Sequence, residues 1–192
     1  MLAERPLNLN PLTLDTAPAK GRALLEQAQK NLGFIPNMYA RMVNSPGLLE
    51  TYLTGYAAFR NESGFTPAEQ EVVFLVISQE NGCEYCVSAH SFIADKKSAL
   101  DPAVTDAIRA GEAIADPRLA ALAAFTRTMV AKRGLPAASE MERFLAAGYT
   151  ERHVLEIVLA IAVKTLSNYA NHLFHTPLDP VFADRKWTDP RV

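Results

Sequence analysis

Residues 64–90 read GFTPAEQEVVFLVISQENGCEYCVSAH, and this stretch decides the fold class and the candidate chemistry. Thr66, followed by Pro67 and by Glu69 three residues on, forms a capping box with proline at the first helical position. The β-branched run that follows resembles a strand, but this cap and the Asn-Gly stop at 81–82 favour a helix. A helix that is apolar on all sides is buried in the protein or at a subunit interface.

The same kinds of signal predict an all-α fold for the rest of the chain. Asp-Pro pairs at 101–102 and 116–117 are typical of helix starts. Ser139 with Glu142 forms a second candidate capping box. Residues 150–172 contain no Gly or Pro, which indicates a long helix.

Pro-rich segments set the predicted domain boundaries. We expect an irregular N-terminal lead at 1–20, a helical domain at 21–176 and an irregular C-terminal arm at 177–192. The arm carries aromatic side chains that suit it to packing on a partner subunit.

Composition excludes several classes of function. The chain has 192 residues, 49% of them hydrophobic, which fits one domain with a real core. Its formal net charge of −2 and the lack of a basic block argue against nucleic acid and anionic membranes as partners. With no signal pattern at the start and no run long enough to span a membrane, we expect a cytoplasmic protein.

A second stretch, GYTERHVLEIVLAIAVKTLSNYANHLFH from residue 148, repeats the first at a constant offset of 85 once one inserted residue is allowed after its opening triplet. Glu71 matches Glu156 and His90 matches His175. The two cysteines match Asn168 and Asn171 in the same register, so only the first copy keeps thiols. We interpret this as an internal duplication of a helix pair.

The chemistry of the first copy centres on Cys83 and Cys86, the only cysteines of the chain. Their spacing places them one helical turn apart, where they can close a small disulfide. His90, four residues after Cys86, is a neighbour on the same face and can exchange a proton with a thiol. Glu71 lies in the preceding apolar helix, where burial is expected to raise its pKa and fit it for proton relay.

The sequence leaves open which thiol is the more acidic. A position at a helix N-terminus favours Cys83 as the thiolate, whereas proximity to His90 favours Cys86. Tyr85, between the two, is a candidate modulator that can shape access or donate a hydrogen bond.

A metal site is the alternative to redox chemistry. Structural zinc takes four ligands, and the chain offers two sulfurs, His90 and three other histidines. Two cysteines and a histidine on one helix would surround a tetrahedral ion only if the helix were distorted, so the pattern favours a redox pair without metal or cofactor.

Together, Glu71, Cys83, Cys86 and His90 form the pattern E-x11-C-x2-C-x3-H. This pattern resembles the signature of AhpD-like alkylhydroperoxidases in the carboxymuconolactone decarboxylase superfamily. The resemblance covers about residues 30–180, including GFIPNMYARMVNSPGLL and AAGYTERHVLEIVLAIA, and is nearest to the peroxidase-related branch.

The resemblance implies an all-α fold with two internally related helical halves, assembled as a homo-oligomer (dimer, trimer or hexamer). It implies a thiol peroxidase in which Cys86 attacks the peroxide and Cys83 resolves the sulfenic acid as a disulfide. His90 and Glu71 would relay protons, and a lipoyl- or thioredoxin-like dithiol donor would reduce the disulfide. Tyr85 departs from AhpD, which has a histidine at that place.

Two further functions stay open. The namesake activity of the superfamily, a lactone decarboxylase or isomerase, would not need the cysteine pair. A non-enzymatic redox sensor would form the disulfide without turning over peroxide.

Overall fold

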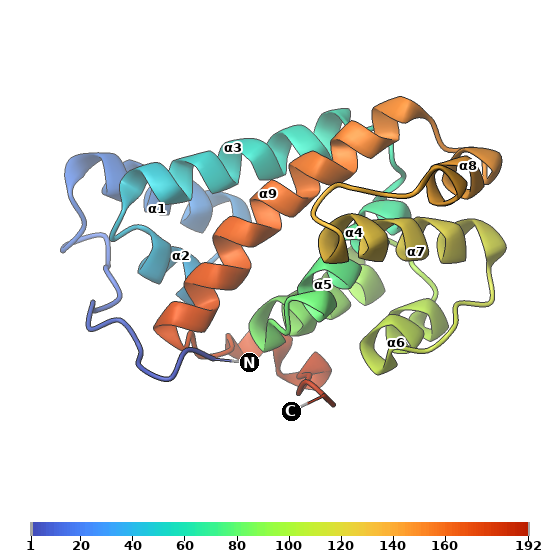
Figure 1. Ribbon diagram of the computed structural model, residues 1–192. Coiled ribbons are helices and arrows are strands. Elements are labelled where there is room, and N and C mark those ends of the chain that lie inside the picture. The colour runs from blue at the N-terminus through green and yellow to red at the C-terminus, as the bar shows by residue number, and fades with distance from the viewer. Residues whose placement is uncertain (1, 192) are drawn as a thin grey trace.

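The computed structural model describes residues 2–191, and within that range every regular element is helical (Figure 1). The all-α prediction is therefore confirmed. The elements are α1 Ala19–Leu32, α2 Asn37–Met42, α3 Pro46–Glu62, α4 Pro67–Glu80, α5 Glu84–Lys97, α6 Pro102–Ala110, α7 Pro117–Ala131, α8 Ala138–Ala146, α9 Glu151–Phe174 and a 3-10 helix η1 Pro180–Arg185.

Helix α4 is the centre of the molecule and packs against α5, α6, α7 and α9. Its capping box forms as the sequence predicts, since the Thr66 hydroxyl accepts from the Glu69 backbone N–H at 3.2 Å. Glu69 Oε2 in turn accepts from the Thr66 backbone N–H at 2.9 Å. Every residue from Glu69 to Gln79 is buried, which explains why the run is apolar on all sides.

The turn between α4 and α5 brings the cysteine pair against the core. Gly82 adopts the left-handed conformation at φ 67°, which a side chain disfavours. The chain then re-enters a helix with Cys83 as N-cap residue, and the Cys83 N–H donates to the Ser78 carbonyl at 2.9 Å. The helix stop at 81–82 and the helix start near Cys83 are both confirmed.

The predicted repeat of a helix pair is wrong. Residues 64–90 bend at Gly82 into two helices, whereas the matched residues 151–174 form the single helix α9 (Figure 1). The second segment has no glycine that could turn the chain inside it. His175 ends α9 in a left-handed conformation, and its ring contacts the Ala3 carbonyl at 2.7 Å.

The predicted cap of α8 is also wrong, by two residues. The helix begins at Ala138, and Glu140 rather than Glu142 accepts from the backbone N–H of the N-cap residue, Ala137, at 2.7 Å. Glu140 sits at the third helical position, and since Ala137 has no side-chain acceptor, only this half of a capping box forms.

The C-terminal segment folds back onto its own chain. Helix η1 packs against α5, and buried Trp187 donates from its backbone N–H to the Ser88 hydroxyl and from its indole N–H to the Arg109 carbonyl, both at 2.9 Å. The aromatic side chains expected to meet a partner subunit therefore serve the protein's own core.

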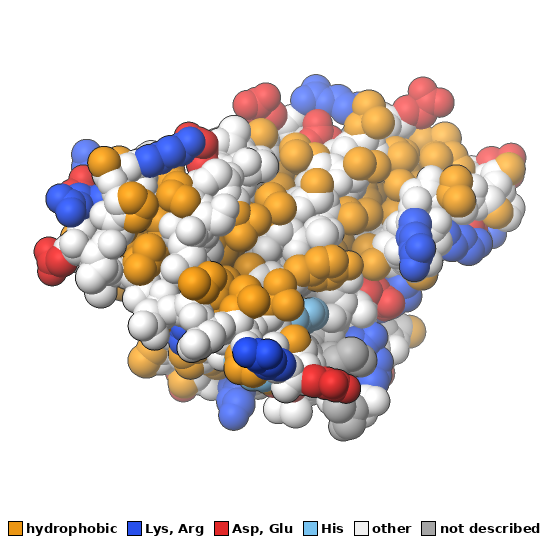
Figure 2. Space-filling model, turned by 60° about the vertical axis from the view of Figure 1, so that its left-hand side comes forward, with side chains coloured by type: hydrophobic (Ala, Val, Ile, Leu, Met, Phe, Trp, Pro, Cys, Tyr) orange, Lys and Arg blue, Asp and Glu red, His pale blue; other side chains and the backbone are white. Residues whose placement is uncertain are grey.

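One face of the molecule carries a band of hydrophobic side chains (Figure 2). Helix α9 leaves Leu155, Val158, Tyr169 and Leu173 exposed, which supports the homo-oligomer as a continuing prediction.

Among the described residues, no helix combines the length and apolar character needed to cross a membrane.

Candidate active site

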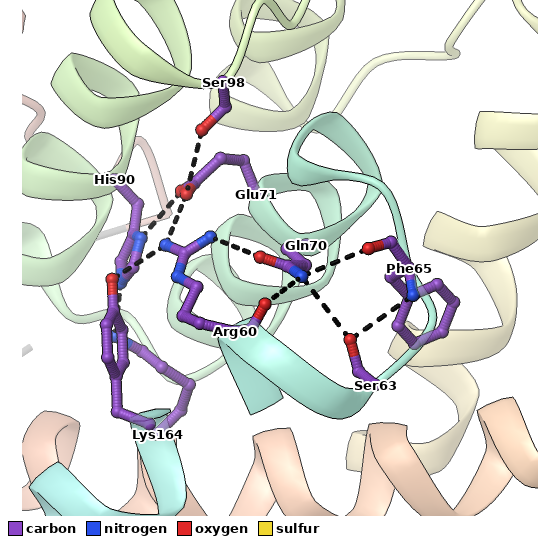
Figure 3. A network of polar contacts seen from close by, with 9 residues as sticks. Arg60, Ser63, Phe65, Gln70, Glu71, His90, Ser98 and Lys164 are labelled. Carbon is purple, nitrogen blue, oxygen red and sulfur yellow. Dashed lines mark hydrogen bonds and ion pairs between the residues drawn. The ribbon is translucent and has the colours of Figure 1, made fainter. Parts of the chain in front are cut away.

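Four helices place charged side chains in one buried cluster (Figure 3). Glu71 of α4 is fully buried, and its Oε2 lies 2.8 Å from His90 Nδ1 of α5. Its Oε1 accepts from the Arg60 guanidinium of α3 and, at 3.4 Å, from the Ser98 hydroxyl. The predicted approach of Glu71 to the helix that carries the cysteines and His90 is thus found.

The predicted raised pKa of Glu71 is wrong. Burial opposes its ionisation, but His90 and then Arg60 outweigh burial and lower the pKa below its ordinary value of 4.5. Arg60 lies eleven residues before Glu71 on another helix, so the sequence does not reveal the pairing. Glu71 is therefore a fixed carboxylate that orients His90.

Both ring nitrogens of His90 are occupied. Since the Glu71 carboxylate can only accept, Nδ1 carries the proton and Nε2 accepts from Lys164 Nζ at 3.0 Å. Burial and then the charge of Lys164 lower the His90 pKa, which favours the neutral imidazole. The described contacts of His90 include no hydrogen bond to Cys86, contrary to the direct proton exchange expected from their spacing.

Lys164 is the site residue that sequence reasoning missed. It lies on α9, is 1% exposed, and holds its ammonium 5.5 Å from the centre of the Phe74 ring. A lysine inside the apolar run VLEIVLAIAVKTL was the signal available, since a buried charge in such a run needs a function or a partner.

The two thiols are free and buried beside α9. Asn171 Nδ2 lies 3.3 Å from Cys86 Sγ and 3.8 Å from Cys83 Sγ. Cys86 Sγ also lies 4.0 Å from the Ser167 hydroxyl. Asn171, which the repeat matched to a cysteine, is therefore a contact of the cysteines rather than their structural equivalent.

The surroundings make the two thiols unequal. For Cys86, burial opposes ionisation, but a hydrogen bond from Cys83 and then the charge of Lys164 hold the pKa well below its usual range. For Cys83, burial and the neighbouring Cys86 raise the pKa well above its usual range. The site therefore favours a Cys86 thiolate that accepts a hydrogen bond from the Cys83 thiol.

The hydroxyl of Tyr85 is hydrogen-bonded to a carboxylate of the C-terminal segment. The hydroxyl donates to Asp179, whose carboxylate also accepts from the Asn37 backbone N–H at 3.1 Å. Burial and then the Asp179 charge raise the Tyr85 pKa. Tyr85 thus joins α5 to the C-terminal segment, and its role as a modulator of the thiols stays a prediction.

A cavity of about 310 Å³ opens onto Cys86, His90 and Lys164. Most of its other lining is aromatic or aliphatic. Phe182 of η1 is the centre of one wall, with edge-to-face contacts to Phe34, Tyr85 and Phe92. An apolar organic molecule fits such a space better than a strongly hydrated one.

The same geometry bears on the metal alternative. Within residues 2–191, no three or more His, Cys, Asp or Glu side chains are grouped so that they could hold a metal ion.

Residues 46–128 match the carboxymuconolactone decarboxylase family, which confirms the superfamily resemblance drawn from the Glu-Cys-Cys-His pattern. The matched segment runs from α3 to α7 and contains Arg60, Glu71, both cysteines and His90. No curated protein sequence matches the chain.

Three solved structures share the fold. An uncharacterized peroxidase-related protein from Ralstonia eutropha JMP134, described as an alkylhydroperoxidase AhpD core, is 23% identical with a TM-score of 0.79, over 94% of this chain and 96% of that one. An uncharacterized peroxidase-related protein from Silicibacter sp. TM1040 is 22% identical, with a TM-score of 0.74 over 92% and 95%. A cysteine-to-alanine variant of the debrominase Bmp8, in complex with 2,3,4-tribromopyrrole, is 18% identical, with a TM-score of 0.74 over 93% and 95%.

Proposed function

We propose that the protein is a thiol peroxidase that reduces organic hydroperoxides through the Cys83–Cys86 pair. The observation that carries the proposal is the unequal pair of thiols at an apolar cavity. Lys164 and the Cys83 hydrogen bond favour the Cys86 thiolate, and the thiolate is the nucleophile in such reactions.

The proposed reaction runs in three steps. The Cys86 thiolate attacks the terminal oxygen of R–O–O–H, the O–O bond breaks, and Cys86 becomes a sulfenic acid while RO⁻ takes up a proton and leaves as an alcohol. The Cys83 thiol then condenses with the sulfenic acid, releasing water and forming the disulfide. A dithiol donor returns two electrons and two protons and becomes a disulfide itself.

Stopped-flow oxidation of the reduced protein tests this proposal. Mixing with cumene hydroperoxide should consume both thiols of each chain, and turnover should continue with dithiothreitol as donor. Cys86→Ser should abolish the reaction, whereas Cys83→Ser should stop at a Cys86 sulfenic acid that dimedone traps. Sulfenic acid on Cys83 in Cys86→Ser would reverse the roles, and thiols that survive excess peroxide would remove the peroxidase function.

A second candidate, reductive dehalogenation, has one observation in its favour. Bmp8, a debrominase by name, shares the fold, and the cavity of this chain is walled by aromatic rings beside Cys86. The Cys86 thiolate would take the halogen from an aryl halide, whose carbon gains a proton. Cys83 would then displace halide and form the same disulfide.

Halide release separates the candidates. Incubation with a bromopyrrole and dithiothreitol should yield bromide only if dehalogenation operates, and Cys86→Ser should end it. An activity on lactones that survives loss of both cysteines would instead favour the namesake decarboxylase chemistry.

A further inference from the structure

Lys164 is a buried cation without a carboxylate partner. Its one described polar contact is His90 Nε2, a neutral acceptor. Glu71, the nearby carboxylate, is already held by Arg60 and His90. A buried ammonium is costly unless an opposite charge compensates it, so the local anion must come from another group.

Cys86 lines the same cavity as Lys164, and its thiolate is the anion available there to compensate the buried ammonium. Arg60 and Lys164 supply two positive charges, and Glu71 and the Cys86 thiolate supply two negative ones, so the reduced cluster is neutral. Disulfide formation removes the thiolate charge. If Lys164 kept its proton, the oxidised cluster would hold one uncompensated buried positive charge.

We propose that Lys164 gives up its proton when the Cys83–Cys86 disulfide forms and regains it when the disulfide is reduced, so that the buried cluster stays neutral through the redox cycle. Lys164 would thus be the proton donor for peroxide reduction and the proton acceptor for disulfide reduction. The proton donation to peroxide rests on the proposed function. The proton uptake during thiol–disulfide exchange with a dithiol does not.

Protons and electrons balance in both halves. In oxidation, R–O–O–H takes two electrons from the sulfurs, the leaving alkoxide takes the Lys164 proton, and the Cys83 proton leaves in water. In reduction, a dithiol gives up two protons, one to the Cys83 sulfur and one to the Lys164 amine, while Cys86 returns as thiolate. The neutral amine keeps two N–H bonds, so its donation to His90 Nε2 survives.

The carboxylate, guanidinium, imidazole and phenol groups around Lys164 keep the same protonation state near neutral pH. The pKa of Glu71 is lowered and that of Arg60 is raised, so both stay ionised. The pKa of His90 is lowered, so its ring stays neutral. The cavity is also lined by four tyrosines of α2, α3 and α5, whose raised pKa keeps them neutral: Tyr39, Tyr52, Tyr56 and Tyr85. Lys97 of α5 is the other ionisable residue of the lining.

The thiol–disulfide equilibrium with dithiothreitol tests the inference without peroxide. It is measured between about pH 6.5 and about pH 8, where dithiothreitol keeps its protons and His90 is neutral. With Lys164 as proton carrier, the exchange moves no proton to or from solvent, and its equilibrium constant should not change with pH. If Lys164 stays charged, the constant should change about tenfold per pH unit, which would overturn the inference.

Thiolate absorbance in the ultraviolet is recorded in the same samples. It should show one thiolate per reduced chain across the range, and its absence would also overturn the inference, because no charge would then be lost on oxidation. If the exchange equilibrium is independent of pH but the protein does not react with peroxide, the Lys164 inference stands and the proposed peroxidase function fails.

Two lysine variants provide a matched comparison. Lys164→Met should slow alkylation of Cys86 by iodoacetamide near pH 6.5 about tenfold or more, because the thiolate loses its counter-charge. Lys96→Met removes an exposed lysine of α5 that does not line the cavity and should change the rate by no more than about twofold. Equal rates in Lys164→Met and the unaltered protein would contradict the inference; should Lys164→Met not fold, the exchange equilibrium decides.

Discussion

Glu69 and Glu71 lie two residues apart on α4 and serve different purposes. Glu69 closes the helix cap at Thr66 and accepts from Arg118 Nε at 3.1 Å and from the Tyr149 hydroxyl at 3.0 Å. Glu71 accepts from Arg60 and holds His90. Both carboxylates are buried, and each pairs with an arginine that also covers an aromatic ring.

The pKa of both carboxylates is lowered, so neither burial nor an arginine partner marks the active site. The difference lies beyond the ion pair. The Glu71 cluster continues through His90 to Lys164, a cation with no carboxylate partner. Lys164 in turn lines the same cavity as the Cys86 thiol. The Glu69 cluster ends in Tyr149 and a helix cap, where every charge has its partner. A charge that needs a reactive partner is therefore the better sign of chemistry.

The largest effect should come from replacing each carboxylate with its amide. Glu71→Gln leaves the Arg60 guanidinium without its anion and frees His90, so kcat/KM for peroxide should fall about 100-fold and the unfolding free energy by about 3–5 kcal/mol. Glu69→Gln should keep kcat/KM within about twofold and lower unfolding free energy by about 1–2 kcal/mol through the weakened cap. Steady-state kinetics and urea unfolding measure the two quantities.

An equal loss of activity in both variants would mean that α4 stability, rather than the His90 contact, governs the chemistry. Iodoacetamide alkylation of Cys86 gives an independent readout, because Glu71→Gln should alter its pH profile and Glu69→Gln should not.

The arginines should give a smaller contrast, expressed in stability. Arg60→Met breaks a pair with a fully buried carboxylate and should lower the unfolding free energy by about 3 kcal/mol. Arg118 is half exposed, so Arg118→Met should lower it by less than about 1 kcal/mol. Urea midpoints with unchanged slopes measure the difference, and similar losses would show that the Arg60 pair is as well solvated as the Arg118 pair.

Acid should remove stability in two stages because of His90 and Glu71. The folded-state pKa of His90 lies below its ordinary value of 6.5, so the unfolded chain binds that proton first and stability begins to fall as pH drops below about 6.5. The folded-state pKa of Glu71 lies below 4.5, so its contribution is present above about pH 4.5 and is lost as pH falls further. Thermal unfolding between about pH 2.5 and pH 8 should show both stages, and Glu71→Gln should flatten the lower one. A stability that stays constant down to about pH 5 would contradict the His90 assignment.

The sequence predicts the local parts of this molecule well. Thr66, Glu69 and Gly82 act within a few residues of themselves, so the helix cap and the turn beside the cysteines follow from short-range geometry. Glu71, Cys86 and His90 could also be selected, because their types and spacing are chemically specific.

The sequence could not reveal the contacts that cross between helices. Arg60 reaches Glu71 from α3, and Lys164 reaches His90 from α9, and both contacts depend on tertiary packing. His90 and then Arg60 reverse the expected pKa shift of Glu71, and Lys164 occupies the Nε2 side of the His90 ring. The matched letters of the apparent repeat likewise reflected the apolar runs of α4 and α9 rather than two equal helix pairs.

The smallest contrast concerns two tyrosines that donate to carboxylates, Tyr85 to Asp179 and Tyr149 to Glu69. Each Tyr→Phe change removes one hydrogen bond to a charged acceptor and should lower the unfolding free energy by about 1.5–3 kcal/mol, a similar amount in both. Tyr85→Phe should leave the pH profile of Cys86 alkylation unshifted, because its hydroxyl binds the C-terminal segment. A shift of that profile in Tyr85→Phe but not in Tyr149→Phe would restore Tyr85 as a modulator of the thiols, acting through the wall that Asp179 and Phe182 form with α5.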